Sequence, residues 1–110
     1  MTTADDVRRL CLGLAGTQEH KHFDRQAFKV ARIYATLPAD GRSVNLKLDA
    51  DEQELKCLTA PDAFAAVPGG WGRMGWTTAR LAALTAEELA AALEAAWRHA
   101  LPQPRPRRRS

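Results

Sequence analysis

Two histidines with metal-binding potential, His20 and His22, lie two positions apart in a polar segment near the N-terminus. In an extended chain their imidazoles would point to the same side, as two ligands of one metal ion do. A protein metal site needs further ligands at a defined spacing, and the nearby Glu19 and Asp24 do not complete a known pattern. We therefore interpret the segment as a polar loop anchored in the core by Phe23, and we expect no metal and no other cofactor.

Neither cysteine has the setting of a catalytic nucleophile. Cys11 falls on the apolar stripe of a predicted helix, where a cysteine serves as a small core residue. Cys57 lies among acidic side chains, the opposite of the electropositive setting of a reactive thiolate. The sequence contains no Ser–His–Asp arrangement, no phosphate-binding loop and no dinucleotide-binding glycine pattern. We predict that the protein is not an enzyme.

Positive charge is the feature with the clearest chemical consequence. The chain of 110 residues carries 16 Lys and Arg against 13 Asp and Glu, a formal net charge of +3. Four arginines lie within residues 105–109, so the rest of the chain is close to neutral. Residues 20–47 nevertheless carry six Lys and Arg against two Asp, whereas residues 49–62 carry five carboxylates against one Lys. We expect one basic surface and a separate acidic one.

Composition restricts the class of protein. With 45% hydrophobic and 26% charged residues, the chain is typical of one small globular domain. No apolar stretch approaches the ~20 residues that cross a membrane, and the acidic start is unlike a signal peptide. Two distant cysteines make no disulfide framework. We predict a cytoplasmic domain over residues 1–101, with no membrane partner, followed by a disordered Pro/Arg-rich tail over residues 102–110.

The elements that position these side chains follow from the periodicity of apolar residues. Helical spacing predicts a helix from Thr3 or Asp5 to about Ala15, and residues 17–26 have no regular pattern. Alternation with period two predicts antiparallel strands at 27–30, 33–37 and 44–49. Further along we expect a helix at 52–58, with Leu55 and Leu58 facing inward, and a helical turn at 63–67. A glycine-rich loop at 68–75 then leads into a fourth strand at 76–81. The last element is a helix at 86–101 that begins with a capping box.

This layout predicts an α+β fold, an antiparallel sheet of about four strands with helices packed on one face. The open face would carry Lys29, Arg32, Tyr34, Asn45 and Lys47, all of which alternate with the apolar positions.

The glycine-rich loop has two interpretations. Its glycines could admit a ligand close to the backbone, or they could make room for indole rings that close the end of the core. We favour the core for Trp76, leave Trp71 undecided, and expect Arg73 to contact a ligand.

Several segments resemble the MmcQ/YjbR family of small bacterial domains. The matching stretches are His22-Phe23, Ala27-Phe28-Lys29-Val30, Ile33-Tyr34-Ala35-Thr36-Leu37, Leu46-Lys47-Leu48 and the glycine-rich segment from Pro68 to Thr77. That last segment is the most specific, and the resemblance extends over residues 3 to about 101. Members are described as DNA-binding "double wing" proteins with a frataxin-like (CyaY-like) fold, so the resemblance implies that fold and a DNA-binding role in a bacterium.

Residues and resemblance together predict a non-catalytic module that binds nucleic acid. Its predicted contacts are phosphate contacts by Lys29, Arg32, Lys47 and Arg73, stacking by Tyr34 and Trp71, and non-specific attraction by Arg107 and Arg108 of the tail. Sequence-specific readout is not expected, because no predicted helix presents a basic face. The alternative is a module that binds a protein or a small ligand on the same sheet face. A simpler interpretation is a solvated face whose lysines maintain solubility.

Overall fold

Helix α1 (Ala4–Leu12) opens the fold in the computed structural model, which describes residues 2–102. Thr3 caps this helix: its side chain accepts a hydrogen bond from the Asp6 amide, and the Asp6 carboxylate accepts one from the Thr3 amide. Val7 and Cys11 are fully buried. The predicted start and apolar stripe are therefore confirmed, although the helix ends earlier than the sequence suggests.

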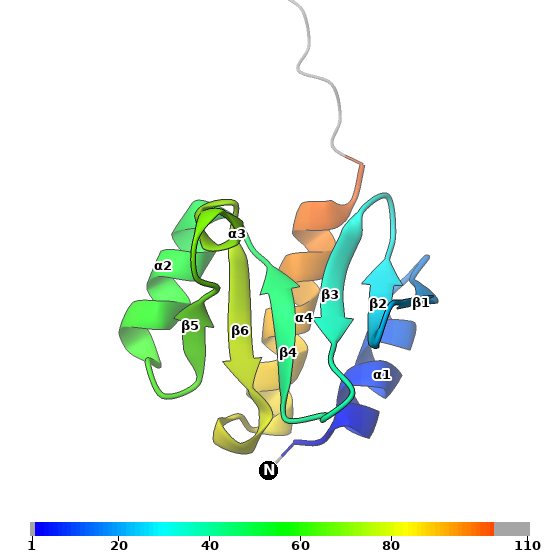
Figure 1. The fold of residues 1–110 in the computed structure, drawn as a ribbon, viewed down its shortest axis with the longest axis horizontal. Coiled ribbons are helices and arrows are strands. Elements are labelled where there is room, and N and C mark those ends of the chain that lie inside the picture. The colour runs from blue at the N-terminus through cyan, green and yellow to red at the C-terminus, as the bar shows by residue number, and fades with distance from the viewer. Residues whose placement is uncertain (1, 103–110) are drawn as a thin grey trace, which may run out of the picture.

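Six strands form one antiparallel sheet in the order β1-β2-β3-β4-β6-β5 (Figure 1). They are β1 (Gln18–His22), β2 (Arg25–Lys29), β3 (Ile33–Leu37), β4 (Ser43–Lys47), β5 (Phe64–Ala66) and β6 (Trp76–Arg80). The α+β class is confirmed, but the predicted number of about four strands is too low. The additional strands are β1, which lies where no regular pattern exists, and β5, which lies where the pattern predicts a helical turn.

Strand β1 escapes sequence prediction because it has no apolar alternation. Glu19, on the helical side of the sheet, forms an ion pair with Arg8 of α1 at 2.8 Å instead of burying an apolar group. The chain turns from β1 into β2 through Phe23, whose φ of 59° lies in the left-handed region. Phe23 is 86% exposed, so the prediction that it anchors this segment in the core is wrong.

Helix α2 (Ala50–Thr59) begins at Asp49, whose carboxylate accepts from the Glu52 amide at 2.8 Å. The predicted inward position of Leu55 and Leu58 is wrong, because they are 57% and 72% exposed. The helix lies at the β5 edge of the sheet and away from the central core. One contact there is a cation–π interaction, in which the Lys56 ammonium lies 5.5 Å from the centre of the Phe64 ring.

Helix α4 (Ala86–Ala100) lies behind β3 and β4, and a short 3-10 helix, η1 (Leu81–Ala83), links it to β6 (Figure 1). The predicted capping box is present, because Thr85 and Glu88 exchange hydrogen bonds between side chain and backbone. Leu89 and Leu93 are fully buried against the sheet. None of the helices within residues 2–102 is long and apolar enough to cross a bilayer.

A bulge between β2 and β3 moves Tyr34 into the core. Phe28 pairs with Ala35, but the next residue, Lys29, pairs with Ile33, so that Tyr34 has no partner across the ladder. Tyr34 is fully buried, and its hydroxyl lies 2.8 Å from the Thr17 hydroxyl. The prediction that Tyr34 lies on the open face is wrong, because a bulge changes which side each residue faces without altering the sequence pattern.

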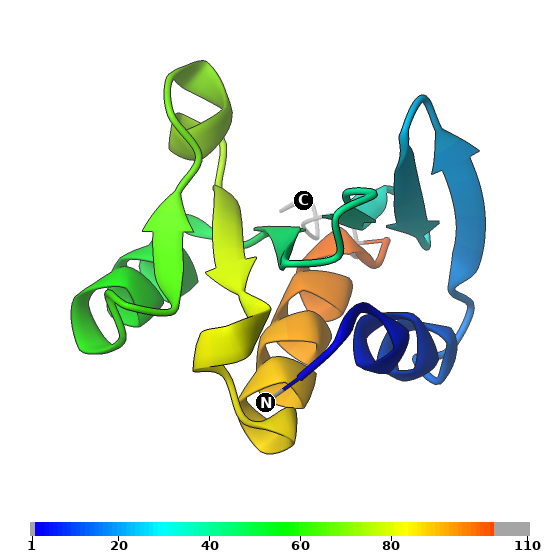
Figure 2. The same ribbon diagram turned by 60° about the horizontal axis from the view of Figure 1, so that its bottom comes forward.

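The sheet is strongly curved. The β1–β2 hairpin rises on one side of the central strands, and the segment from β5 through helix α3 (Gly70–Arg73) to β6 rises on the other side (Figure 2). We call these two projections the hairpin wing and the glycine wing. The side of the sheet that faces away from α4 lies between them, and we call it the concave face.

Two glycines of the glycine wing make close backbone contacts. Gly75 has a φ of 105°, and a Cβ added there would lie 2.0 Å from the carbonyl oxygen of Leu48. The Leu48 amide donates to the Gly75 carbonyl at 2.9 Å, which ties the wing to the end of β4. Gly72 is similarly confined, because a Cβ there would lie 1.9 Å from the Val67 carbonyl oxygen. Gly72 and Gly75 therefore permit backbone contacts that a side chain would block.

We predict that Gly75→Ala lowers the free energy of unfolding by about 2 kcal/mol or more, since it adds both a clash and a strained φ. Gly70→Ala is the matched control: a Cβ there meets nothing within 4 Å, and we expect a change of less than about 1 kcal/mol. Urea unfolding followed by circular dichroism measures both. Equal effects of the two substitutions would contradict the packing role of Gly75.

Candidate functional site

Strand register decides which side chains lie on the concave face, because residues directly opposite each other in a ladder point to the same side. The pairs Ala27–Thr36, Thr36–Asn45 and Asn45–Thr78 establish this side across the centre of the sheet. The strand positions that share it are Gln18, His20, His22, Arg25, Ala27, Lys29, Ile33, Thr36, Ser43, Asn45, Lys47, Ala65, Trp76, Thr78 and Arg80.

The strands carry no carboxylate on the concave face. Four cations, Arg25, Lys29, Lys47 and Arg80, occupy this side, together with two histidines. The six strands contain one acidic residue, Glu19, and it faces α1 on the other side. The predicted basic surface therefore exists as one face of the sheet, although the described part of the chain is close to neutral as a whole.

A groove of about 380 Å³ lies on the concave face. It extends from one wing to the other and is lined by His22, Arg25, Ile33, Thr36, Asn45, Val67, Trp71 and Trp76. The glycine wing contributes an apolar wall that contains both indoles, and Trp71 is 63% exposed. The hairpin wing contributes the basic wall. The groove therefore presents a flat apolar surface opposite a cationic one.

Polar donors line the groove beside the apolar wall. Thr78 donates to Asn45 Oδ1 at 2.8 Å, so the amide nitrogen of Asn45 remains to donate to a ligand. The Nη1 atom of Arg25 is buried and has no hydrogen-bond partner among residues 2–102. A buried donor without a partner is energetically unfavourable in the unliganded fold.

The predicted site residues lie in different parts of the structure. Lys29 and Lys47 lie on the concave face, and Trp71 lines the groove. Tyr34 lies in the core and cannot stack on a ligand in this conformation. Arg107 and Arg108 fall outside the described residues.

Two arginines of the predicted set lie outside the groove. Arg32, in the turn between β2 and β3, donates to the backbone carbonyl of His99 at 2.8 Å. Arg73 is exposed, but it follows Trp71 by two residues in α3 and so projects about 200° around the helix from it.

Arg25 and Trp76 are among the groove residues that were not identified from the sequence. Arg25 lies in the segment read as an irregular polar loop, and the spacing of His20, His22 and Arg25 around a short turn is the signal that could have revealed it. Trp76 is expected from the sequence to close the core, and this is wrong: it pairs with Lys47 on the concave face and lines the groove.

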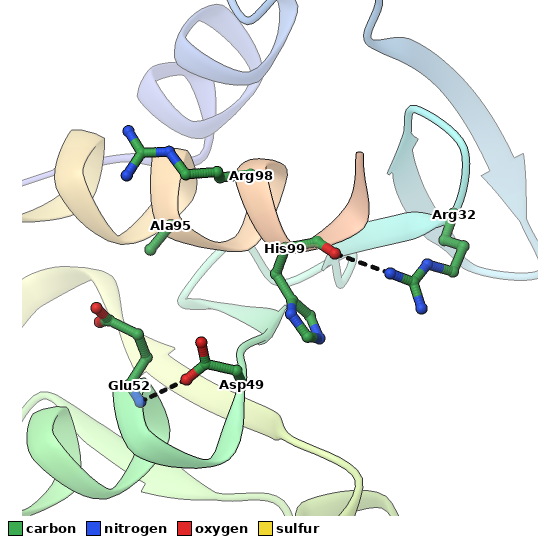
Figure 3. Close-up of a pocket in the computed structure, with 6 residues that line it drawn as sticks. All are labelled: Arg32, Asp49, Glu52, Ala95, Arg98 and His99. Atoms are coloured by element: carbon green, nitrogen blue, oxygen red, sulfur yellow. Dashed lines mark hydrogen bonds between the residues drawn. The ribbon is translucent and has the colours of Figure 1, made fainter. Parts of the chain in front are cut away.

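A second cavity, of about 570 Å³, lies between the end of α4 and the start of α2 (Figure 3). It is lined by Arg32, Asp49, Glu52, Ala95, Arg98 and His99. Each charged group in it has a protein partner: Arg32 bonds to the His99 carbonyl, Asp49 caps α2, Glu52 lies 3.6 Å from Lys56, and Arg98 pairs with Glu94. These groups already stabilise the fold, so the cavity is the weaker candidate for a ligand.

Metal-binding and nucleophilic groups are sparse in the described chain. Within residues 2–102 no group of three or more His, Cys, Asp or Glu side chains is placed to hold a metal ion. Cys11 is a core residue, as predicted, and its burial raises the pKa of the thiol to about 12. Burial also raises the pKa of Tyr34. Neither group is ionised near neutral pH, which leaves both as structural residues.

We predict an effect of pH on stability through His99. Burial, and then the charges of Lys47 and Arg32, lower the pKa of this imidazole below its ordinary value of 6.5. The unfolded chain then binds the proton more readily, so the contribution to stability is present above pH 6.5 and is lost as the pH falls. When the pH falls from about 7.5 to about 5, the free energy of unfolding should decrease less for His99→Gln than for the unchanged protein. Urea unfolding at both pH values measures this, and parallel losses would contradict it.

Comparison with known proteins identifies relatives of this fold. The family model YjbR matches residues 12–99. The crystal structure of the Deinococcus radiodurans protein DR2400, with the family-model domain DUF419, is similar with a TM-score of 0.74 and 27% sequence identity. The similarity covers 88% of this chain and 77% of that chain. No curated protein matches the sequence. Because the family match spans the whole sheet with both wings and nearly all of α4, the chain belongs to the YjbR family.

Proposed function

We propose that this domain binds nucleic acid on the concave face of its sheet, without catalysing a reaction. The observation that carries the proposal is the charge of that face: four Lys and Arg side chains, two histidines and no carboxylate on its strands. A nucleic acid is a regular array of phosphates, and lysine and arginine bind it by displacing its counterions.

The location of the acidic residues supports the same proposal. The clustered carboxylates belong to α2 and α4, and α4 lies behind the sheet, on the side away from the groove (Figures 1 and 2). A polyanion that approaches the concave face therefore meets cations first. Because the net charge of the folded part is small, the attraction of a polyanion to the whole domain is weak. The segregation of charge is what would orient the domain with its concave face toward the polyanion.

The proposal assigns a role to each part of the face. Arg25 and Lys29 in β2 and Lys47 in β4 would contact phosphates, while Trp71 would stack on an exposed base. Arg32 and Arg73 lie outside the groove, and we assign them no contact within it. Arg107 and Arg108 would add non-specific attraction that any binding experiment must separate from that of the face.

The test is salt-dependent binding to a labelled 20-nucleotide DNA, single-stranded or duplex, measured by fluorescence anisotropy. The full chain is used with the four arginines of residues 105–109 changed to glutamine, so that binding reports on the folded part. We expect binding at low salt that weakens as salt rises. Lys47→Ala and Arg25→Ala should each lower the slope of log K against log salt by about 0.7 to 0.9, the value for one lost phosphate contact.

Two controls accompany these variants. Arg9→Ala removes a cation from α1, on the helical side of the sheet, and should leave the slope unchanged. Lys21→Ala removes a cation of β1 that lies on the helical side of the sheet, and it should likewise leave the slope unchanged. The proposal fails if the tail-neutralised chain has no affinity at low salt, because the arginine tail would then account for all binding. It also fails if Arg9→Ala changes the slope as much as Lys47→Ala does.

A further inference from the structure

We infer that the groove of the concave face holds a single unpaired base, and that the ligand is therefore single-stranded nucleic acid. This inference rests on the proposed function and specifies its ligand. The groove offers two kinds of surface side by side: indole and aliphatic groups at the glycine wing, and hydrogen-bond donors at the hairpin wing and on the central strands. A nucleobase has the complementary pair of surfaces, a flat apolar face and a polar edge.

The apolar part of the groove is built to present an indole. Trp71 lies between Gly70 and Gly72, neither of which has a side chain that could cover it. The turn that carries it is held by backbone hydrogen bonds from the Met74 amide to the carbonyls of Gly70 and Trp71, both at 3.1 Å. An exposed tryptophan on such a constrained turn can bury its ring against a base at little cost in conformational freedom.

The polar part of the groove offers donors without partners. Within residues 2–102 the Asn45 amide nitrogen has no hydrogen-bond partner, while its oxygen accepts from Thr78, and the Arg25 side chain lines the same part of the groove. The edges of nucleobases carry carbonyl oxygens and ring nitrogens that accept from such groups. A base edge beside Asn45 would accept from its amide nitrogen, which an aliphatic ligand could not do.

The size of the groove favours one base over a duplex. A volume of about 380 Å³ falls in the range of pockets that enclose a small molecule. In a duplex each base is stacked on its neighbours, and only its edges are accessible in the grooves. Trp71 could reach a base face in a duplex only after that base had been unstacked, whereas a single strand offers its bases directly.

The test compares a 12-nucleotide oligothymidylate with a duplex of equal length at the same salt concentration. It uses the full chain with the tail arginines neutralised, as above. We expect the single strand to bind at least tenfold more tightly. Trp71→Ala should weaken single-strand binding about tenfold, the effect of losing one base–aromatic stack, and should leave the salt slope unchanged because no phosphate contact is lost.

Matched variants keep the result interpretable. Trp71→Phe retains an aromatic ring and should retain most of the affinity. Trp97→Phe replaces an indole that lies at α4, where it donates to the Ala15 carbonyl, and should leave binding unchanged. Thermal unfolding followed by circular dichroism checks that each variant is folded. We expect the Trp71 variants to fold, because this side chain is exposed.

Several outcomes would overturn the inference. If single strand and duplex bind equally and Lys47→Ala still lowers the salt slope, the proposed function stands but the base-binding groove does not. If Trp71→Ala binds the single strand as tightly as the unchanged protein, the indole is not a stacking surface. If a hexaglutamate peptide binds as tightly as the oligonucleotide, the face recognises charge alone. Absence of binding to any nucleic acid would remove the proposed function itself.

Discussion

The close backbone contact between Gly75 and Leu48 fixes the geometry on which the candidate site depends. The Leu48 amide donates to the Gly75 carbonyl at 2.9 Å, and the left-handed φ of Gly75 lets the chain pass from α3 into β6 without a clash. Gln53 of α2 reinforces the same corner by donating to the carbonyls of Gly72 and Trp76 at 2.9 and 3.2 Å. Trp71 is thereby held above the sheet by backbone geometry, with few side-chain contacts of its own.

A second constraint orients the opposite wing. Because of the bulge in β3, the Tyr34 side chain lies on the side of the sheet that faces α1. Its hydroxyl contacts the Thr17 hydroxyl, immediately before β1, and donates to the Cys11 carbonyl at 3.4 Å. The Arg8–Glu19 ion pair joins α1 to β1 itself. Because both contacts attach the start of the hairpin wing to α1, the position of Arg25 across the groove from Trp71 follows from the packing of α1, and not from the groove residues alone.

Sequence reasoning predicted the elements whose signals are local and missed those that depend on tertiary contacts. The caps at Thr3 and Thr85 and the alternation in β4 report directly on local structure, so the starts of both helices and the place of this strand follow from the sequence. Strand β1 is polar on both sides because Glu19 finds Arg8 from another element, so its pattern contained no strand signal. Of the predicted site, Lys29 and Lys47 lie on the concave face, because they belong to regular strands, and Trp71 of the glycine-rich turn lines the groove. Tyr34 was misplaced by a bulge that no spacing reveals.

Net charge and surface charge are different properties in this domain. The cations of residues 20–47 and the carboxylates of residues 49–62 nearly cancel over the chain, yet the fold separates them. Alternation along the strands places Arg25, Lys29 and Lys47 on one side, and the helix caps place most carboxylates on the helices. The same two local rules that stabilise strands and helices thus generate the segregated charge. A binding face of this kind needs no excess of positive charge in the folded part. Salt would weaken binding by screening the few ionic contacts made at this face, because the domain has no strong long-range field to screen.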